Sequence, residues 1–122
     1  MIQLKQFNSK TIKTISEEFA SPKSIIKLDR GYIDSFFTDG PFLKVEVVGN
    51  DPKLVIKEGL RQVREHYASK LLINLITPEK KKETNKAVTE LSRQFDSSLY
   101  DTFYWALTIK NQEHTTLLIY AQ

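Results

Sequence analysis

Three consecutive lysines, Lys80, Lys81 and Lys82, form the densest group of like charges in the sequence. Neighbouring ammonium groups can bind phosphate groups or the acidic surface of another protein. A run of this kind also fits the solvated face of a helix, which needs no ligand. The residue types therefore predict an interaction site at these lysines, with the solvated helix face as the alternative.

Two carboxylates, Asp29 and Asp34, are close enough in the sequence to work together as general acid and base. Each also has a structural explanation, because Asp29 can cap a helix that begins after it and Asp34 can be a solvated residue of that helix. The two histidines, His66 and His114, lack the close spacing of a metal-binding pair. We therefore predict no metal site.

Several kinds of catalytic and cofactor site are absent from the sequence. The four glycines are isolated, so they form neither the dinucleotide fingerprint nor the Walker phosphate loop. No serine lies in a Gly-x-Ser-x-Gly elbow, and the absence of cysteine excludes disulfides, thiolate zinc sites and a cysteine nucleophile. We expect no cofactor on this chain alone, and a role in binding a macromolecule rather than catalysis by the isolated chain.

Length and composition predict one folded domain over residues 1–122. Hydrophobic residues make up 40% of the sequence and charged residues 27%, as in ordinary globular domains. The 18 Lys and Arg are offset by 15 Asp and Glu, so net charge does not by itself indicate a nucleic-acid partner. The sequence has neither the apolar run of a signal peptide nor a window long enough to span a membrane. We expect a cytoplasmic protein.

The elements that must position these residues begin with two expected helices and a short strand, 25–28, between them. The first helix, 9–20, has an apolar stripe at spacings of three and four, and Pro22 ends it. Asp29 can cap the second helix. The stripe of the first helix needs a cover, which makes it a further candidate for contact with a partner. It consists of Ile12, Ile15 and Phe19.

Strands and helices alternate along the middle of the chain. Residues 42–48 alternate as a strand with one wetter face, and Asp51 followed by Pro52 marks the start of a helix. The continuous apolar run 71–76 predicts a central strand with parallel neighbours, covered on both faces. The Thr-Pro pair at 77–78 is expected to start the next long helix.

The C-terminal sequence predicts two strands, TFYWALTI and TTLLIYA, joined as a hairpin by a five-residue loop. The whole pattern predicts an α/β (α+β) fold, with a mixed sheet of four to five strands, helices packed against it and a core over 24–122. Apolar side chains alternate along the first strand of the hairpin, so its rings are expected to be buried. These alternating residues are Phe103, Trp105, Leu107 and Ile109.

Three segments together resemble the C-terminal domain of the FtsZ and tubulin family. The segment TIKTISEEFASPKSIIKLDRGYIDSFF, residues 11–37, is similar to the junction between the two halves of FtsZ. LLINLITP resembles a later strand of that family, and YDTFYWALTIKNQEHTTLLIYA resembles its closing pair of strands. The matching positions in the junction are Ile15, Ser16, Pro22, Ile26, Leu28, Asp29 and Ile33.

This resemblance implies a domain that lacks the GTP-binding half, either the C-terminal part of a GTPase or a free-standing relative. GTP would then lie on a missing or partner domain, and the helix 9–20 would be the end of the helix that joins the two halves. Asp29 takes the place of the first acid that activates GTP hydrolysis on the next subunit. Lys27 and Tyr32 replace the other polar residues of that motif, and a tyrosine is a poor base at neutral pH. Asp29 is therefore expected either to activate hydrolysis in trans or only to cap a helix.

We predict an interaction domain of tubulin or FtsZ type that contributes to, or regulates, a cytoskeletal or cell-division filament. Its expected partner is a second copy of itself or an FtsZ-like GTPase. One alternative is a nucleic-acid-binding module, in which Lys80, Lys81 and Lys82 bind phosphates and the rings of TFYWALTI stack on bases. Another is a small-molecule enzyme with a site between subunits.

Overall fold

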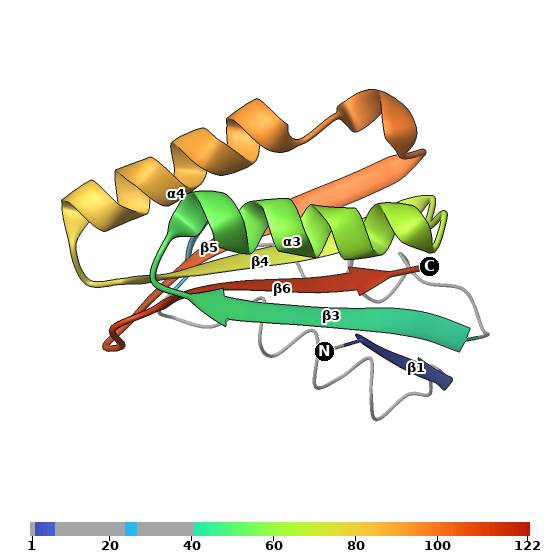
Figure 1. Cartoon of the computed structure of the whole chain (residues 1–122), viewed down its shortest axis with the longest axis horizontal. Helices are drawn as coiled ribbons and strands as arrows, with labels where there is room; N and C mark the ends of the chain where they lie inside the picture. Colours follow the sequence, from blue (N-terminus) through green and yellow to red (C-terminus); the bar gives the residue numbers. More distant parts are fainter. Residues whose placement is uncertain (1, 7–23, 27–40) are drawn as a thin grey trace.

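The computed structural model describes residues 2–6, 24–26 and 41–122 of the chain (Figure 1). The expected helix 9–20, with the contact residues Ile12, Ile15 and Phe19, lies outside these residues. Asp29 and the helix expected after it also lie outside them. The expected strand at 25–28 is described over Ser24–Ile26.

The described strands form one mixed sheet in the order β1-β3-β6-β4-β5-β2. Only β4 and β5 run parallel, and every other neighbouring pair is antiparallel. The predicted α/β fold with a mixed sheet is confirmed, and the sheet also includes β1, a strand that was not predicted from the sequence. The strands are β1 Ile2–Gln6, β2 Ser24–Ile26, β3 Pro41–Gly49, β4 Lys70–Pro78, β5 Thr102–Lys110 and β6 Thr115–Ala121.

The predicted hairpin of the last two strands is wrong, because β4 lies between β5 and β6. In register, Leu71 of β4 pairs with Phe103 of β5 on one side and with Ala121 of β6 on the other. Every residue of β4 after Lys70 is buried, so this strand needs partners on both edges and cover on both faces. Its predicted central position is confirmed, whereas its parallel pairing is limited to β5.

Helix α3, Pro52–Glu65, begins where the sequence predicted. Asp51 caps it by accepting a hydrogen bond from the Lys53 backbone N–H at 3.1 Å, and Pro52 occupies the first turn. Gly59 faces β6 so closely that an added Cβ would lie 2.5 Å from Leu117 Cδ2. The absence of a side chain at Gly59 therefore lets α3 pack close to the sheet.

Helix α4, Lys81–Gln94, starts later than predicted. The Thr-Pro pair at 77–78 ends β4, and Lys80 is the N-cap residue of the helix. Thr77 is fully buried at the end of the strand. A short 3-10 turn, η1 Ser97–Leu99, follows α4 and leads into β5.

Helices α3 and α4 lie side by side on one face of the sheet (Figure 1). The main core lies between them and the strands, and it draws on alternate residues of β3, β4 and β6. The opposite face of the central strands is also buried, and there Thr108 Oγ1 donates to Asn74 Oδ1 at 3.0 Å. The largest fully buried side chains are Phe42, Val45, Ile56, Leu71, Leu72, Ile73, Leu75, Leu117 and Ile119.

Candidate interaction surface

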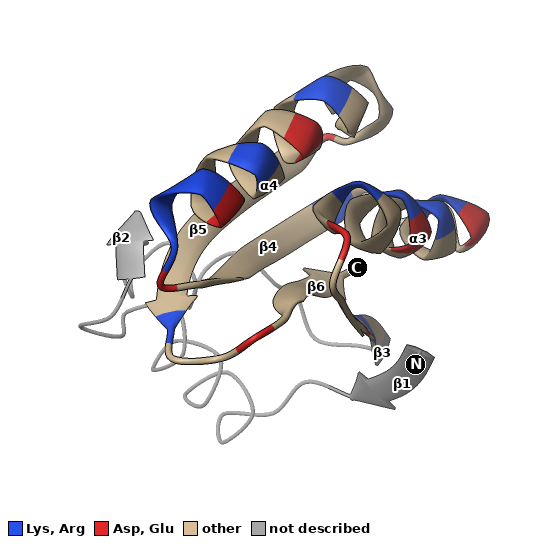
Figure 2. Cartoon of the chain, turned by 60° about the vertical axis from the view of Figure 1, so that its left-hand side comes forward, with Lys and Arg blue, Asp and Glu red and all other residues tan. Residues whose placement is uncertain are grey.

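The predicted lysine site lies at the start of α4. Lys80 is the N-cap residue, while Lys81 and Lys82 belong to the first turn, and all three are exposed. Figure 2 shows blue, the colour of Lys and Arg, over this first turn. The backbone N–H groups of a first helical turn already give that end a positive charge, so three ammonium groups there add to an existing positive field.

Lys80 and Lys81 line a cleft between the start of α4, the C-terminal end of β5 and the residue that follows it. The cleft has a volume of about 780 Å³, and we call it the basic cleft. Its polar groups come from the start of α4, from Glu79 before it and from Asn111 after β5, and its apolar wall comes from β5. The lining residues are Glu79, Lys80, Lys81, Thr84, Asn85, Leu107, Ile109 and Asn111.

Hydrogen bonds between the end of β4 and the start of α4 fix Thr84, which lines the basic cleft. Thr77 Oγ1 and Thr84 Oγ1 lie 3.0 Å apart, and the Lys80 backbone N–H donates to the Pro78 carbonyl at 2.7 Å. Both threonines are buried. The lysines are therefore mounted on a turn that the core holds in place, with their charged groups free to reach an acidic partner.

The nucleic-acid alternative depends on the three lysines and on the aromatic rings of β5, and the structure places these two groups apart. Phe103 and Trp105 lie beside Phe95, which follows the C-terminal end of α4, whereas the lysines lie at its N-terminal end. A helix of 14 residues is about 21 Å long. The basic cleft has Leu107 and Ile109 beside it instead, and neither offers a ring for stacking on a base.

The rings of β5 are less buried than predicted. Leu107 is buried, but Trp105 is half-buried and Phe103 is 38% exposed. They border a second depression of about 230 Å³ between α4, η1 and β5, which we call the aromatic hollow. The Phe95 ring centroid lies 4.7 Å from that of Phe103. The lining residues are Ile73, Leu91, Ser92, Phe95, Ser97, Phe103 and Trp105.

The aromatic hollow was not predicted from the sequence. The signal for it in the sequence is the run FDSSLYD, in which Asp96 caps η1 by accepting hydrogen bonds from the backbone N–H and the hydroxyl of Ser98. These two hydrogen bonds lower the pKa of Asp96, and burial raises the pKa of the Tyr100 hydroxyl. The turn fixes Tyr100 against Phe95, with ring centroids 5.4 Å apart.

Neither histidine takes part in either depression of the surface. His114 Nδ1 contacts Asn50 Oδ1, which links the β5–β6 loop to the turn before α3. His66 is the C-cap residue of α3. Among the residues that the structure describes, no three metal-binding side chains gather into a site, and none of the described helices has the length and apolar character needed to cross a membrane.

Comparison with known proteins gives a fold likeness without a sequence match. The chain matches no family model and no curated protein by sequence. It is similar in structure to an FtsZ dimer of M. jannaschii, with a TM-score of 0.61 and 18% identity over 85% of this chain and 33% of that one. It is also similar to the GDP-form protofilaments of TubZ from Bacillus thuringiensis serovar israelensis, with a TM-score of 0.55 and 10% identity over 87% of this chain and 32% of that one.

The fold is therefore that of one part of FtsZ and TubZ, as the sequence resemblance implied. The chain spans about a third of the length of the solved structures that it matches. At these identities the likeness concerns the fold, and what those proteins assemble into is a matter of proposal for this chain.

Proposed function

We propose that the chain is a cytoplasmic protein–protein contact domain of FtsZ and TubZ type, which binds an acidic surface of a second subunit through the basic cleft. That subunit is either another copy of the chain or an FtsZ-like GTPase. The proposal draws on the fold, because the similar solved structures include an FtsZ dimer and TubZ protofilaments. The role in this chain would be assembly or regulation of a cytoskeletal or cell-division filament.

The observation that carries the proposal is the position of the lysines at the positive end of α4. Acidic residues are favoured there and basic residues are disfavoured, by about 0.3–1 kcal/mol each. Lys80, Lys81 and Lys82 therefore oppose the helix that they begin, and the two acids there, Glu79 and Glu83, offset only part of their charge. A purely structural role does not explain the three lysines. An acidic partner surface would compensate for this by meeting the lysines and the helix end together.

The predicted GTP chemistry belongs to the partner in this proposal. The chain supplies contact residues, and Asp29 is the acid that the sequence resemblance directs toward a nucleotide held by the next subunit. Ile12, Ile15 and Phe19 remain a proposed apolar contact on the N-terminal side. The enzyme with an intersubunit site remains the alternative, with no described residues that favour it.

Sedimentation velocity at several salt concentrations tests the contact at the basic cleft. The site variant is Lys80→Glu/Lys81→Glu, and the matched control is Lys53→Glu/Lys57→Glu, which makes the same change in charge on exposed residues of α3. We expect salt-sensitive association of the natural chain that only the site variant loses. Equal loss in both variants would mean that net charge, rather than the cleft, drives association.

A chain that stays monomeric throughout would contradict contact between copies. The partner would then have to be a GTPase of FtsZ type. In that case the chain must change the amount of such a GTPase that pellets as filaments, and Lys80→Glu/Lys81→Glu must remove the change. Tight binding of duplex or single-stranded DNA by the natural chain would support the nucleic-acid alternative instead, if the same variant loses that binding.

A further inference from the structure

Tyr67 is a protruding aromatic residue at the end of α3. It follows the C-cap residue His66, its backbone φ is 54°, and its side chain is 92% exposed. A left-handed backbone is unfavourable for a bulky residue, whereas glycine or asparagine adopts it readily. The chain thus holds a large ring in solvent at a position where a smaller residue would fold more easily.

The aromatic hollow offers a complementary shape on the same molecule. Ile73 and Leu91 are buried at its base, and Phe103 and Trp105 form a partly exposed wall. Ser92 and Ser97 supply hydroxyl groups among the lining residues. A phenol ring fits this chemistry, because its faces can pack on the other rings while its hydroxyl reaches a serine.

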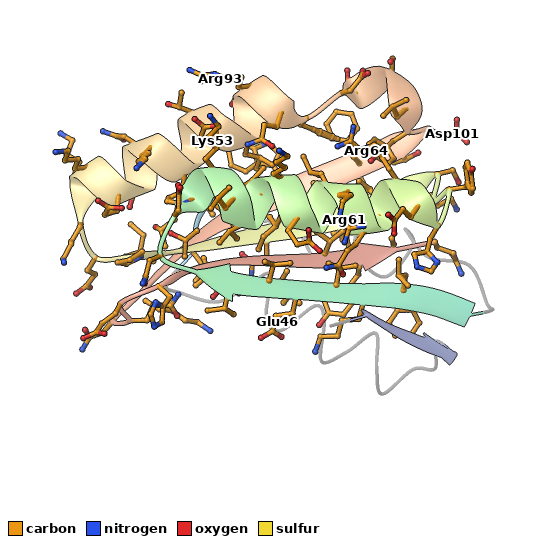
Figure 3. The ribbon with its side chains drawn as sticks, viewed as in Figure 1. Glu46, Lys53, Arg61, Arg64, Arg93 and Asp101 are labelled. Atoms are coloured by element: carbon orange, nitrogen blue, oxygen red, sulfur yellow. The ribbon has the colours of Figure 1, made fainter. Side chains whose placement is uncertain are left out.

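Tyr67 and the aromatic hollow lie at the same end of the domain. The backbone N–H of Asp101 donates to the Ser69 carbonyl at 2.8 Å, which ties the approach to β5 to the loop after Tyr67. Figure 3 shows Arg64, near the end of α3, at the same end of the domain as Asp101. The start of α4, which carries the lysines of the basic cleft, lies at the opposite end (Figure 1).

We infer that this end of the domain is a self-complementary contact, in which the Tyr67 ring of one copy occupies the aromatic hollow of a second copy. Because ring and hollow share one end, a two-fold axis lets both copies exchange rings at once, as closed dimers require. With 92% of its side chain exposed, Tyr67 does not fill the hollow of its own chain. Tyrosine and tryptophan at the centre of such a contact are the residues that contribute most to affinity.

Charge pairing contributes little to this contact, because Asp96, at the edge of the hollow, already lies near Arg64 of its own chain. This contact is mainly apolar, so high salt should preserve it, whereas high salt should weaken the contact at the basic cleft.

Trp105 is the only tryptophan of the chain, so its fluorescence reports directly on the hollow. We expect its emission to shift to shorter wavelength as the concentration rises from micromolar to millimolar at high salt, in step with dimer formation in sedimentation equilibrium. Tyr67→Asn should weaken the dimer by about tenfold or more, equivalent to about 1.4 kcal/mol. Tyr67→Phe keeps the ring and should retain most of the affinity.

Two further variants separate this contact from general effects. Tyr67→Asn relieves the left-handed backbone, so its thermal midpoint should be equal to or above that of the natural chain, and lost association cannot then be lost folding. Leu54→Ser removes an apolar side chain that is 59% exposed in the first turn of α3, and it should leave the dimer unchanged. A natural chain that is monomeric at high salt, a Tyr67→Asn variant that dimerises normally, or an equal loss in Leu54→Ser would each overturn the inference.

Discussion

Thr77 Oγ1 and Thr84 Oγ1 lie 3.0 Å apart, and this buried hydrogen bond joins the C-terminal end of strand β4 to the first turn of helix α4. Thr84 also donates to the Pro78 carbonyl at 3.4 Å. The pair sits directly beneath the lysines of the basic cleft. It therefore links the buried centre of the sheet to the surface that we propose to be functional.

Changing Thr84 to valine should destabilise the domain more than changing both threonines. The single change leaves the Thr77 hydroxyl buried without this partner, which typically costs about 1–3 kcal/mol. In Thr77→Val/Thr84→Val both groups are apolar and similar in shape, so part of the loss should be recovered. Urea unfolding of both variants and of Thr77→Val measures the coupling, and strictly additive effects would contradict the pair.

The lysine substitutions proposed above should raise stability while they lower association. In Lys80→Glu/Lys81→Glu, carboxylates replace ammonium groups at the positive end of α4, and each change should contribute roughly 0.3–1 kcal/mol. The free energy of unfolding at low salt should therefore increase. A decrease, measured by urea titration followed by circular dichroism, would mean that these lysines stabilise the fold and would weaken the functional argument.

Acid sensitivity should reveal the ion pairs on the outer face of α3. Arg61 donates to Glu58 and Glu65, and the hydrogen bond from Arg61 lowers the pKa of Glu58 from 4.5 to about 2, with a smaller contribution from Gln62. The associated stabilisation is present above pH 4.5 and is lost as the pH falls toward 2. In Glu58→Gln, the stability should change less over this interval, and its loss should be small because the pair is exposed. Carboxyl titration by NMR checks the pKa, and an ordinary value would contradict the ion pair.

The isolated chain should not bind GTP. Its four glycines are scattered, so no loop of backbone N–H groups can form around phosphates in the manner of a nucleotide-binding motif. Titration calorimetry with GTP and magnesium should show no binding heat beyond dilution. A dissociation constant in the micromolar range would contradict the assignment of GTP to a partner.

Periodicity predicted the elements that bury one face or both faces. The Asp51 cap of α3 and the apolar run of β4 follow local rules, and the structure confirms them. The spacing of apolar residues also predicts a buried stripe of Ile56, Leu60, Val63 and Tyr67 on this helix. The first three are buried, but Tyr67 is wrong, because it lies beyond the end of the helix and is 92% exposed. The Thr-Pro pair at 77–78 satisfies the rule for a helix start equally well, yet the buried ladder between β4 and β5 continues through Pro78. Local sequence signals could not decide whether these two residues begin a helix or end a strand.

The order of strands depends on contacts that are distant in the sequence. The sequences of β5 and β6 predict a hairpin, because few residues lie between them along the chain. In the sheet, however, the buried strand β4 pairs with both of them and lies between them. The exposure of Phe103 has a related cause, because α4 contacts β4 more extensively than β5. The basic cleft was predictable as a charge run. The aromatic hollow needed the three-dimensional arrangement of α4, η1 and β5.

Hydrogen exchange of the chain at low and high concentration tests the proposed contact most directly. The first amides of α4 have no partner within the helix, so they should exchange fast in the free chain and report any contact made over them. We expect slower exchange at high concentration in residues 79–85 and 107–111, and no such slowing in Lys80→Glu/Lys81→Glu. If the associated chain shows unchanged exchange in both segments, the basic cleft is not the contact between subunits.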